Sequence, residues 1–242
     1  MRRFVYFYRM THDTGFAPCV YENGYKVSDT LTLACCKGGQ IRKCGKAKTK
    51  KGINTGLRHA IGVRHLDGIK DKTDEVYVVG IMKNRVLYIA QITDICEMKE
   101  YFSDEKNKNR LDSIYNYSET PEFCFDKEFH LARNKNNEIF HTDKEQEQCR
   151  RDELGKYVLI SKSFVYFGNK AETSTIDKKY FDILPKCQET KAYSDGQNGF
   201  STALDLIDEF WKDRITVASE NPTQKSTQSC KSSTQKTVRK DC

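Results

Sequence analysis

The chain has 242 residues, of which 37% are hydrophobic and 31% are charged, and its formal net charge is +7. This length suits one large domain or two small ones that bury a core without disulfide bonds. The chain contains no apolar run near the ~20 residues of a membrane span, and Tyr6, Tyr8 and Arg9 interrupt any signal-peptide core behind the basic N-terminus. We therefore expect a cytosolic protein without a membrane partner.

The N-terminal part of the chain predicts a strand, a loop and a second short element. Residues 4–10 alternate in the period-2 pattern of a strand, and a loop punctuated by Gly15 and Pro18 follows. Residues 31–34 fit either a short strand or a helical turn. The Lys- and Gly-rich stretch that continues to about residue 56 has no periodicity, so we expect a surface loop.

The middle of the chain predicts a β-hairpin. The β-branched runs 75–82 and 85–95 flank Lys83-Asn84, a two-residue connection typical of hairpins. Residues 96–105 fit a short helix, and residues 106–123 are polar and irregular.

The C-terminal part predicts strands and then a helix. Residues 156–168 fit a buried strand or a bent pair of strands. Residues 201–212 show the clearest helical pattern of the chain, with Thr202 as the N-cap and Asp205 at the capping-box position. Its apolar stripe for core packing consists of Leu204, Ile207, Phe210 and Trp211.

Together these elements predict an α+β domain built on a curved antiparallel sheet or small barrel, with a C-terminal helix covering one side. We expect a single domain over residues 1–215. Residues 219–242 are rich in Ser, Thr, Gln and Lys and almost free of apolar side chains, which predicts a disordered basic tail.

A basic segment, residues 42–51, carries six cations and no acid. Such a cluster attracts polyanions through counterion release, although a solvated surface loop has the same composition. The ten cysteines include no CxxC pair, so reduced thiols fit better than a zinc site, and we predict no metal. The common nucleotide-loop and hydrolase motifs are absent, and no cofactor can be assigned.

Several short motifs, in order along the chain, resemble one known family. They are the strand up to Met10, Asp13–Pro18, Thr32–Ala34, Cys36-Lys37, Ile41-Arg42, Val78–Gly80, Leu87–Ala90, Met98–Phe102, Glu138–His141, Leu159–Ser161 and Phe164–Gly168. Over about residues 3–185 the chain is similar to the second of the nucleotide modification associated domain families. That resemblance implies a role in the modification of DNA bases or nucleotides in bacteria or phages, without defining an activity. The hairpin also resembles the small PUA-like barrels that read modified bases, but a fold alone does not fix a function.

The chain departs from the family pattern at two places. The family has a Gly-Thr-Gly-Ser-like turn after its central strand, where this chain has Gly80-Ile81-Met82-Lys83. An insert at about residues 43–74 contains most of the basic segment, so the resemblance does not extend to those charges.

Asp13 is the first candidate site residue. A carboxylate at a strand end can orient a base edge, accept a proton or act as a nucleophile, but Asp-x-Gly is also ordinary turn chemistry. Phe16 offers a face for base stacking, or else anchors its loop in the core. Tyr88 and Tyr166 lie in strands, where they either line the same pocket or pack in the core.

Lys37 and Arg42 are candidates for binding a phosphate, and Cys36 lies directly before Lys37. Cys36 would be nucleophilic only if those cations lower its pKa, and a buried thiol is the simpler interpretation. His141 can act as a general acid or base or read a base edge, although a histidine beside an apolar strand is often structural.

Three hypotheses follow. In the first, the domain recognises a nucleotide or modified base in nucleic acid and contacts the backbone through Lys43, Lys46, Lys48, Lys50 and Lys51. In the second, it is an enzyme of nucleotide or base modification, a transferase or glycosidase with Asp13 or His141 as acid or base. In the third, it is a non-catalytic component of a modification or phage-defence operon.

Overall fold

The computed structural model describes residues 1–11, 13–23, 26–35, 40–41, 53–54, 56–117, 123–125, 132–133, 139–140, 152–187 and 189–211. The helices there are α1 (Gly56–Lys70), α2 (Met98–Ser103) and α4 (Phe200–Trp211), with 3-10 turns η1 (Glu105–Asn107), η3 (Gly168–Ser174) and η4 (Lys178–Ile183). The strands are β1 (Arg2–Met10), β2 (Cys19–Glu22), β3 (Lys26–Leu33), β4 (Gln40–Ile41), β5 (Ile53–Asn54), β6 (Asp74–Met82), β7 (Arg85–Gln91), β8 (Asp94–Glu97), β9 (Tyr115–Tyr117), β10 (Phe123–Phe125), β11 (Ala132–Arg133), β12 (Ile139–Phe140), β13 (Tyr157–Ser161), β14 (Ser163–Tyr166) and β15 (Thr190–Ser194).

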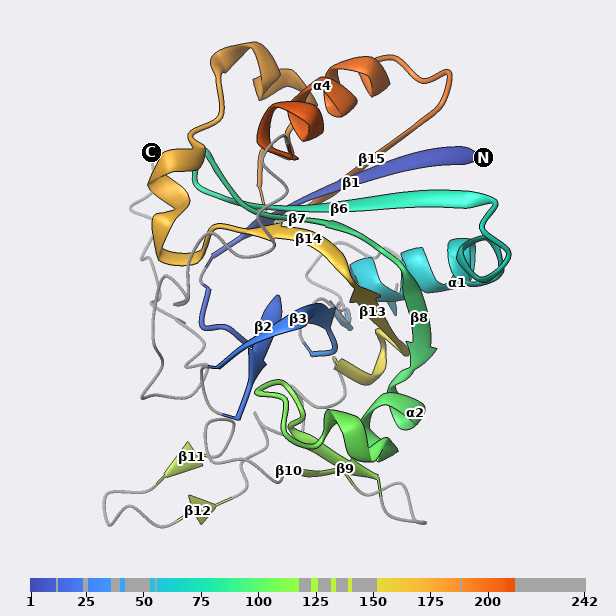
Figure 1. Cartoon of the computed structure of the whole chain (residues 1–242), viewed down its shortest axis with the longest axis vertical. Helices are drawn as coiled ribbons and strands as arrows, with labels where there is room; N and C mark the ends of the chain where they lie inside the picture. The colour runs from blue at the N-terminus through green and yellow to red at the C-terminus, as the bar shows by residue number, and fades with distance from the viewer. Residues whose placement is uncertain are drawn as a thin grey trace, which may run out of the picture.

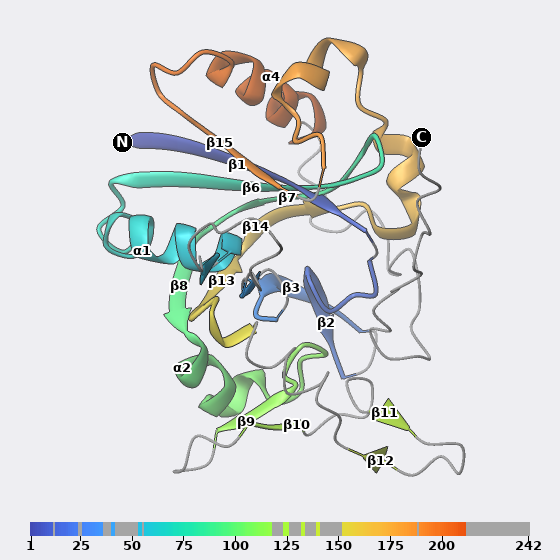
Figure 2. The same ribbon diagram turned by 180° about the vertical axis from the view of Figure 1, so that it is seen from behind.

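Two curved sheets form the frame of the domain. The larger sheet has the strand order β14-β7-β6-β1-β15, and the smaller has the order β2-β3-β13-β8. Helix α4 covers the outer face of the larger sheet, while α2 and the β9-β10 ribbon lie beyond the smaller one (Figures 1 and 2). The predicted α+β class and the covering C-terminal helix are therefore confirmed, and the described strands form two open sheets rather than a closed barrel.

The larger sheet is mixed, which corrects the prediction of an antiparallel sheet. Strands β1 and β6 run parallel over their whole length, from the pair Arg2 and Asp74 to the pair Met10 and Met82. Parallel neighbours need a long crossover connection, and here that connection includes α1, which packs against β6. The predicted hairpin is confirmed as β6 and β7, joined at Lys83-Asn84.

The two sheets share one bent pair of strands, as predicted for residues 156–168. The pairing of β7 with β14 continues past the corner as the pairing of β8 with β13. At the corner the fully buried Ser161 hydroxyl lies 2.7 Å from the carbonyl oxygen of Gln91 and 2.8 Å from that of Ser163. The hydroxyl thus pairs with carbonyls where the ladder bends.

Helix α1 lies inside the region expected as a basic insert, and the sequence did not predict it. Its buried face combines Leu57, Ile61 and Ile69 with the polar side chains of Arg58 and His65, both fully buried. These two residues interrupt the apolar stripe from which a helix is normally predicted. Part of the insert is therefore an integral piece of the core.

Helix α4 begins one residue earlier than predicted, at Phe200. Thr202 consequently lies in the first turn and is not the N-cap. The buried positions are Phe200, Ala203, Leu206 and Ile207, while the predicted Leu204, Phe210 and Trp211 are partly buried at the edge of the same core. The predicted role in core packing is confirmed, with the stripe rotated around the helix.

The predicted tail at residues 219–242 lies outside the described residues. Among the residues that the structure does describe, no helix combines the length and apolar character that a membrane span requires.

Gly80 lies in strand β6 and not in a turn. A Cβ atom on Gly80 would lie 2.2 Å from Cε1 of Tyr88 and 2.9 Å from Sδ of Met10. The absence of a side chain at this position lets the ring of Tyr88 lie across the sheet.

We expect Gly80→Ala to destabilise the domain by about 1–3 kcal/mol, because the new methyl group overpacks the core against the Tyr88 ring. Gly196→Ala is the comparison for backbone strain without overpacking, since a Cβ there meets nothing within 4 Å while its positive φ of 82° disfavours alanine. Urea unfolding of the two variants measures the difference. A Gly80→Ala variant as stable as the wild type would contradict this packing.

Candidate functional site

The Asp13 loop, residues 13–18, connects β1 to β2 and holds a carboxylate at the end of the larger sheet. The Asp13 side chain is only 1% exposed, and its Oδ2 accepts a 2.8 Å hydrogen bond from the hydroxyl of Tyr166. Its Oδ1 accepts from the backbone N–H of Gly15 at 3.2 Å, an Asx-turn contact. Gly15 has a φ of 85° and lies so close to the Tyr21 ring that a Cβ would be 2.8 Å from it.

A row of tyrosines crosses the inner face of the larger sheet and ends at this loop. Tyr8, Gly80, Tyr88 and Tyr166 are direct neighbours on β1, β6, β7 and β14. The hydroxyls of Tyr8 and Tyr88 are 2.7 Å apart, which is possible because the ring of Tyr88 lies over Gly80. Tyr166 then directs its hydroxyl to Asp13.

The hydrogen bonds at Asp13 have a fixed direction. Tyr21 donates to the hydroxyl oxygen of Tyr166 at 3.4 Å, and Tyr166 donates to the Asp13 carboxylate. Burial, followed by the negative charge of Asp13, raises the pKa of Tyr166 well above its ordinary value. Burial also raises the pKa of Tyr88. The phenols therefore remain protonated at neutral pH and act as hydrogen-bond donors and not as bases.

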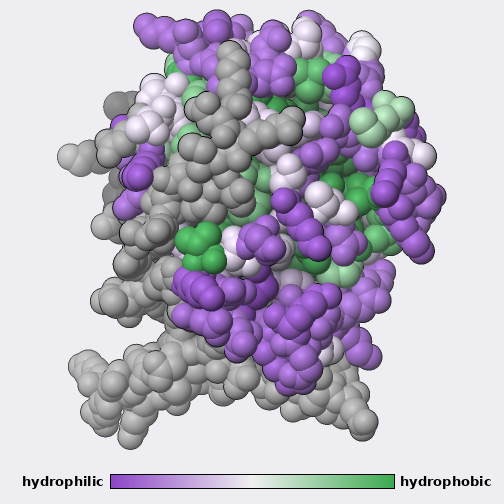
Figure 3. All heavy atoms as spheres, in the orientation of Figure 1, coloured by the Kyte–Doolittle hydropathy of each residue, from purple (hydrophilic) through white to green (hydrophobic). Residues whose placement is uncertain are grey.

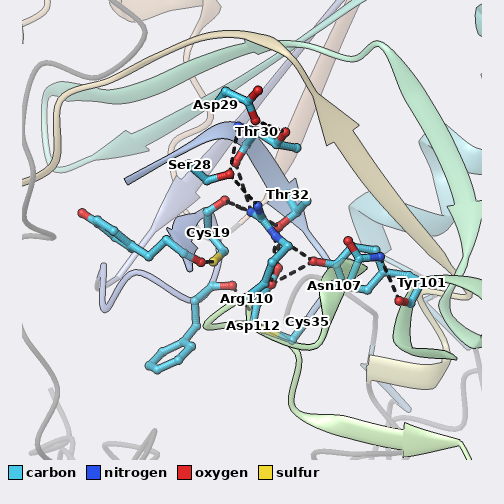
Figure 4. A network of polar contacts seen from close by, with 12 residues as sticks. Cys19, Ser28, Asp29, Thr30, Thr32, Cys35, Tyr101, Asn107, Arg110 and Asp112 are labelled. Atoms are coloured by element: carbon cyan, nitrogen blue, oxygen red, sulfur yellow. Dashed lines mark hydrogen bonds and ion pairs between the residues drawn. The ribbon is translucent and has the colours of Figure 1, made fainter. Parts of the chain in front are cut away.

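A second buried network fixes β2 and β3 beside the Asp13 loop (Figure 4). The Arg110 guanidinium donates to the carbonyl oxygens of Cys19 and Thr30, both at 3.0 Å. It also donates to the hydroxyls of Ser28, at 3.1 Å, and of Thr32, at 3.0 Å. One side chain from the segment after η1 thus connects both strands.

Asp112 balances the charge of Arg110 in this network. Its carboxylate is fully buried and accepts hydrogen bonds from Tyr101, at 2.9 Å, and from Thr32. Burial alone would lower the pKa of Arg110, but the negative charge of Asp112 acts the other way, and the pKa lies above its ordinary value. Burial, with the Asp112 charge second, also raises the pKa of Cys19 to about 12, so Cys19 is a thiol and not a nucleophilic thiolate.

The structure brings together three of the predicted site residues: Asp13, Tyr166 and Tyr88. Phe16, by contrast, is 4% exposed and packs beyond the smaller sheet with Met98 and Phe102. Its side chain anchors the Asp13 loop in this core, and the structure shows no exposed face on which a base could stack.

The remaining predicted site residues lie outside the described side chains. They are Cys36, Lys37, Arg42, Lys43, Lys46, Lys48, Lys50, Lys51 and His141. The described residue before the first of them is nevertheless informative. The thiol of Cys35 lies 3.3 Å from the carbonyl oxygen of Phe16, so Cys35 itself lies directly against the Asp13 loop.

Sequence reasoning missed Tyr8, Tyr21, Arg110 and Asp112. Tyr8 gave a usable signal, because it alternates along a predicted strand and faces the same side as Tyr6. Arg110 and Asp112 gave none, since they lie in the polar stretch that had no periodicity. Among the described residues, no three His, Cys, Asp or Glu side chains are grouped so as to hold a metal ion.

The fold and the site define a two-sheet α+β domain with a tyrosine-supported carboxylate at one end of the larger sheet. A family model, described as nucleotide modification associated domain 2, matches residues 2–229, and the chain belongs to that family. The match extends beyond the predicted span of residues 3–185. Comparisons with curated proteins and with solved structures give no match.

The contact between Asp13 and Tyr166 leads to a testable coupling. We expect Tyr166→Phe and Asp13→Ala to be non-additive, with an interaction energy of about 0.5–3 kcal/mol in a double-mutant cycle, because each change removes the same hydrogen bond. Tyr193→Phe is the control partner, since its hydroxyl donates to the carbonyl of Ile183 instead. Additive losses for Asp13 and Tyr166 would argue against the hydrogen bond.

Arg110→Met is expected to destabilise the domain by about 3–5 kcal/mol, because it leaves the Asp112 carboxylate buried without its cation. Lys106→Met, which removes an exposed ion pair with Asp104, is the control and should change stability little. Denaturant midpoints compare the two variants. Similar small losses in both would show that Arg110 does not support β2 and β3.

Proposed function

We propose that the domain binds a nucleotide, or a base within nucleic acid, at the Asp13 loop. The observation that carries this proposal is the buried carboxylate of Asp13, oriented by Tyr166 and Gly15 at a sheet end. A carboxylate in that position is already oriented before binding. Because Asp13 is only 1% exposed, the proposal requires the Asp13 loop to move for a ligand to reach it. Membership of a family associated with nucleotide modification supports the same ligand class.

Asp13 also limits which base edge fits. A carboxylate only accepts hydrogen bonds, so its ligand must present N–H groups, as the amino group of cytosine or its derivatives does. Tyr166 holds its proton and already donates it to Asp13. The proposed contact therefore favours a donor-bearing base edge.

The basic segment supplies the expected contact with phosphates. It lies in the connection between β4 and β5, which pair through Gln40 with Asn54 and Ile41 with Ile53. Both ends of the segment are thus held together, and six cations belong to one short connection. Concentrated cations of this kind favour polyanions with a strong dependence on salt.

An enzyme of nucleotide or base modification is the second candidate. It is favoured by the contact between the buried carboxylate of Asp13 and a neutral phenol, 2.8 Å apart, which pairs a proton acceptor with a proton donor. In that reading Asp13 accepts a proton from the substrate, and His141, outside the described residues, is the other candidate acid or base.

A purely partner-binding component is less well supported on the face that Figure 3 shows. The described residues there are mainly hydrophilic, and hydrophobic side chains appear only in separate patches. The fully buried centre of a protein interface is more apolar than the surrounding surface.

Fluorescence polarisation with labelled duplexes, single strands and nucleotides, across a salt series, tests the proposal. We expect a variant with five lysines of the basic segment changed to Gln to bind nucleic acid at least ~10-fold more weakly at low salt, with a flatter salt dependence. The five are Lys43, Lys46, Lys48, Lys50 and Lys51. The matched control changes five exposed lysines of the described surface to Gln: Lys26, Lys72, Lys99, Lys162 and Lys178.

Asp13→Asn should reduce discrimination between bases while leaving the salt dependence unchanged, because it removes an acceptor and not a phosphate contact. Equal effects of the two lysine sets would contradict the role of the basic segment. Conversion of a free nucleotide that survives the lysine changes and is lost in Asp13→Asn would favour the enzyme.

A further inference from the structure

A buried hydrogen-bond relay joins α1 to the larger sheet, away from the Asp13 loop. The hydroxyl of Tyr6, on β1, lies 2.8 Å from Nε2 of His65, on α1. Nδ1 of His65 lies 2.8 Å from Oδ2 of Asp74, at the start of β6. The side chains of His65 and Asp74 are completely buried, and Tyr6 is 4% exposed.

The chemistry of the partners fixes the position of each proton. The Asp74 carboxylate only accepts, so Nδ1 of His65 carries the ring proton and donates it to Asp74. Nε2 is then the free acceptor, and Tyr6 donates its hydroxyl proton to it. The neutral imidazole therefore satisfies every member of the relay.

The charged groups that face His65 are Asp74, Arg2 and Arg64. Arg2 donates to the other oxygen of Asp74 at 2.8 Å, so that carboxylate already pairs with one cation. Arg64 lies beside Tyr6, with its guanidinium 4.8 Å from the centre of the Phe4 ring, against which His65 also packs. A proton added to His65 thus places a further positive charge among two cations and one carboxylate.

We propose that Tyr6, His65 and Asp74 form a proton-sensitive latch that fastens α1 to the larger sheet. Protonation of His65 turns Nε2 from an acceptor into a donor, and it then competes with the hydroxyl proton of Tyr6. That proton loses its described acceptor inside the core, where an unpaired donor is costly. The latch closes when His65 is neutral and loosens when it is protonated.

The direction of the pH dependence follows from His65. Burial lowers its pKa below the ordinary value of 6.5, while Asp74 acts against that shift and both arginines reinforce it. The unfolded chain therefore binds the proton more readily than the folded one. Stability contributed by the latch is present above about pH 6.5 and is lost as the pH falls through the folded value. Asp74, whose pKa is also lowered, titrates in a separate and more acidic range.

The latch has a consequence for the β4-β5 ribbon, because β5 ends only two residues before α1 begins. If the proposed function holds, loosening α1 displaces one end of the ribbon that carries the basic segment. Binding of nucleic acid should then weaken on acidification, although acid alone would add positive charge. The stability effect does not depend on the proposed function.

Urea unfolding and amide-exchange protection of α1 at about pH 8 and about pH 5.5 test the latch in the full chain. His65→Gln is the diagnostic variant, because its amide can both donate and accept but does not titrate in this range. His59→Gln is the matched control on the same helix, since the buried Nδ1 of His59 has no hydrogen-bond partner among the described residues. Tyr6→Phe removes the hydroxyl that protonation would leave unpaired.

We expect the wild type and His59→Gln to lose urea midpoint and α1 protection at the lower pH. His65→Gln should lose most of this pH dependence, and Tyr6→Phe part of it. Retention of the full wild-type pH dependence in His65→Gln would overturn the latch, as would a His65 pKa at or above 6.5 by NMR. Should His65→Gln fail to fold, the NMR titration of His65 in the wild type still tests the latch. Failure to bind any nucleotide or nucleic acid would overturn the proposed function and leave the latch untouched.

Discussion

The structure depends on one constraint: phenol hydroxyls that point between the two sheets must find partners away from water. An unpaired buried hydroxyl costs roughly 1–3 kcal/mol, so each of these tyrosines requires a hydrogen-bonding group on the residue that it faces. Tyr6 pairs with His65, Tyr8 pairs with Tyr88, and Tyr21 and Tyr166 lead to Asp13. Both the candidate site and the latch are places where such a chain of hydroxyls ends at an ionisable group.

This arrangement separates the proposed binding site from the contacts that support it. The Asp13 loop follows β1, whereas His65 and Asp74 hold the helix that precedes β6, so the two ionisable ends lie on opposite sides of the tyrosine row along β1. Arg110 meanwhile fixes β2 and β3, the strands that follow the Asp13 loop. A rigid scaffold of this kind is what loop-borne binding residues require.

Much of the fold could be predicted where the pattern was local. The strand at residues 4–10, the hairpin around Lys83-Asn84 and the bent strands at 156–168 all have β-branched or aromatic runs with clear turn signals. Helix α1 could not be predicted, because Arg58 and His65 occupy its buried face. The parallel pairing of β1 with β6 was also missed, since strand direction across a long connection leaves no local pattern.

The site was partly predictable for the same reason. Asp13 was evident from its turn chemistry, and Tyr166 from its strand. Their contact, across 153 residues, is a property of the folded sheet and has no local signal. Phe16 illustrates the opposite case, because an aromatic residue in a loop looks alike in sequence whether it binds a ligand or anchors the loop.

The most direct test of this account is NMR chemical-shift mapping of the full chain with nucleoside monophosphates that carry plain and modified bases. The account predicts that the largest shifts fall on the Asp13 loop, on Cys35 and on Tyr166, and that they depend on the base. Shifts centred on another part of the surface, or none at millimolar nucleotide, would contradict the assignment of Asp13 to the binding site.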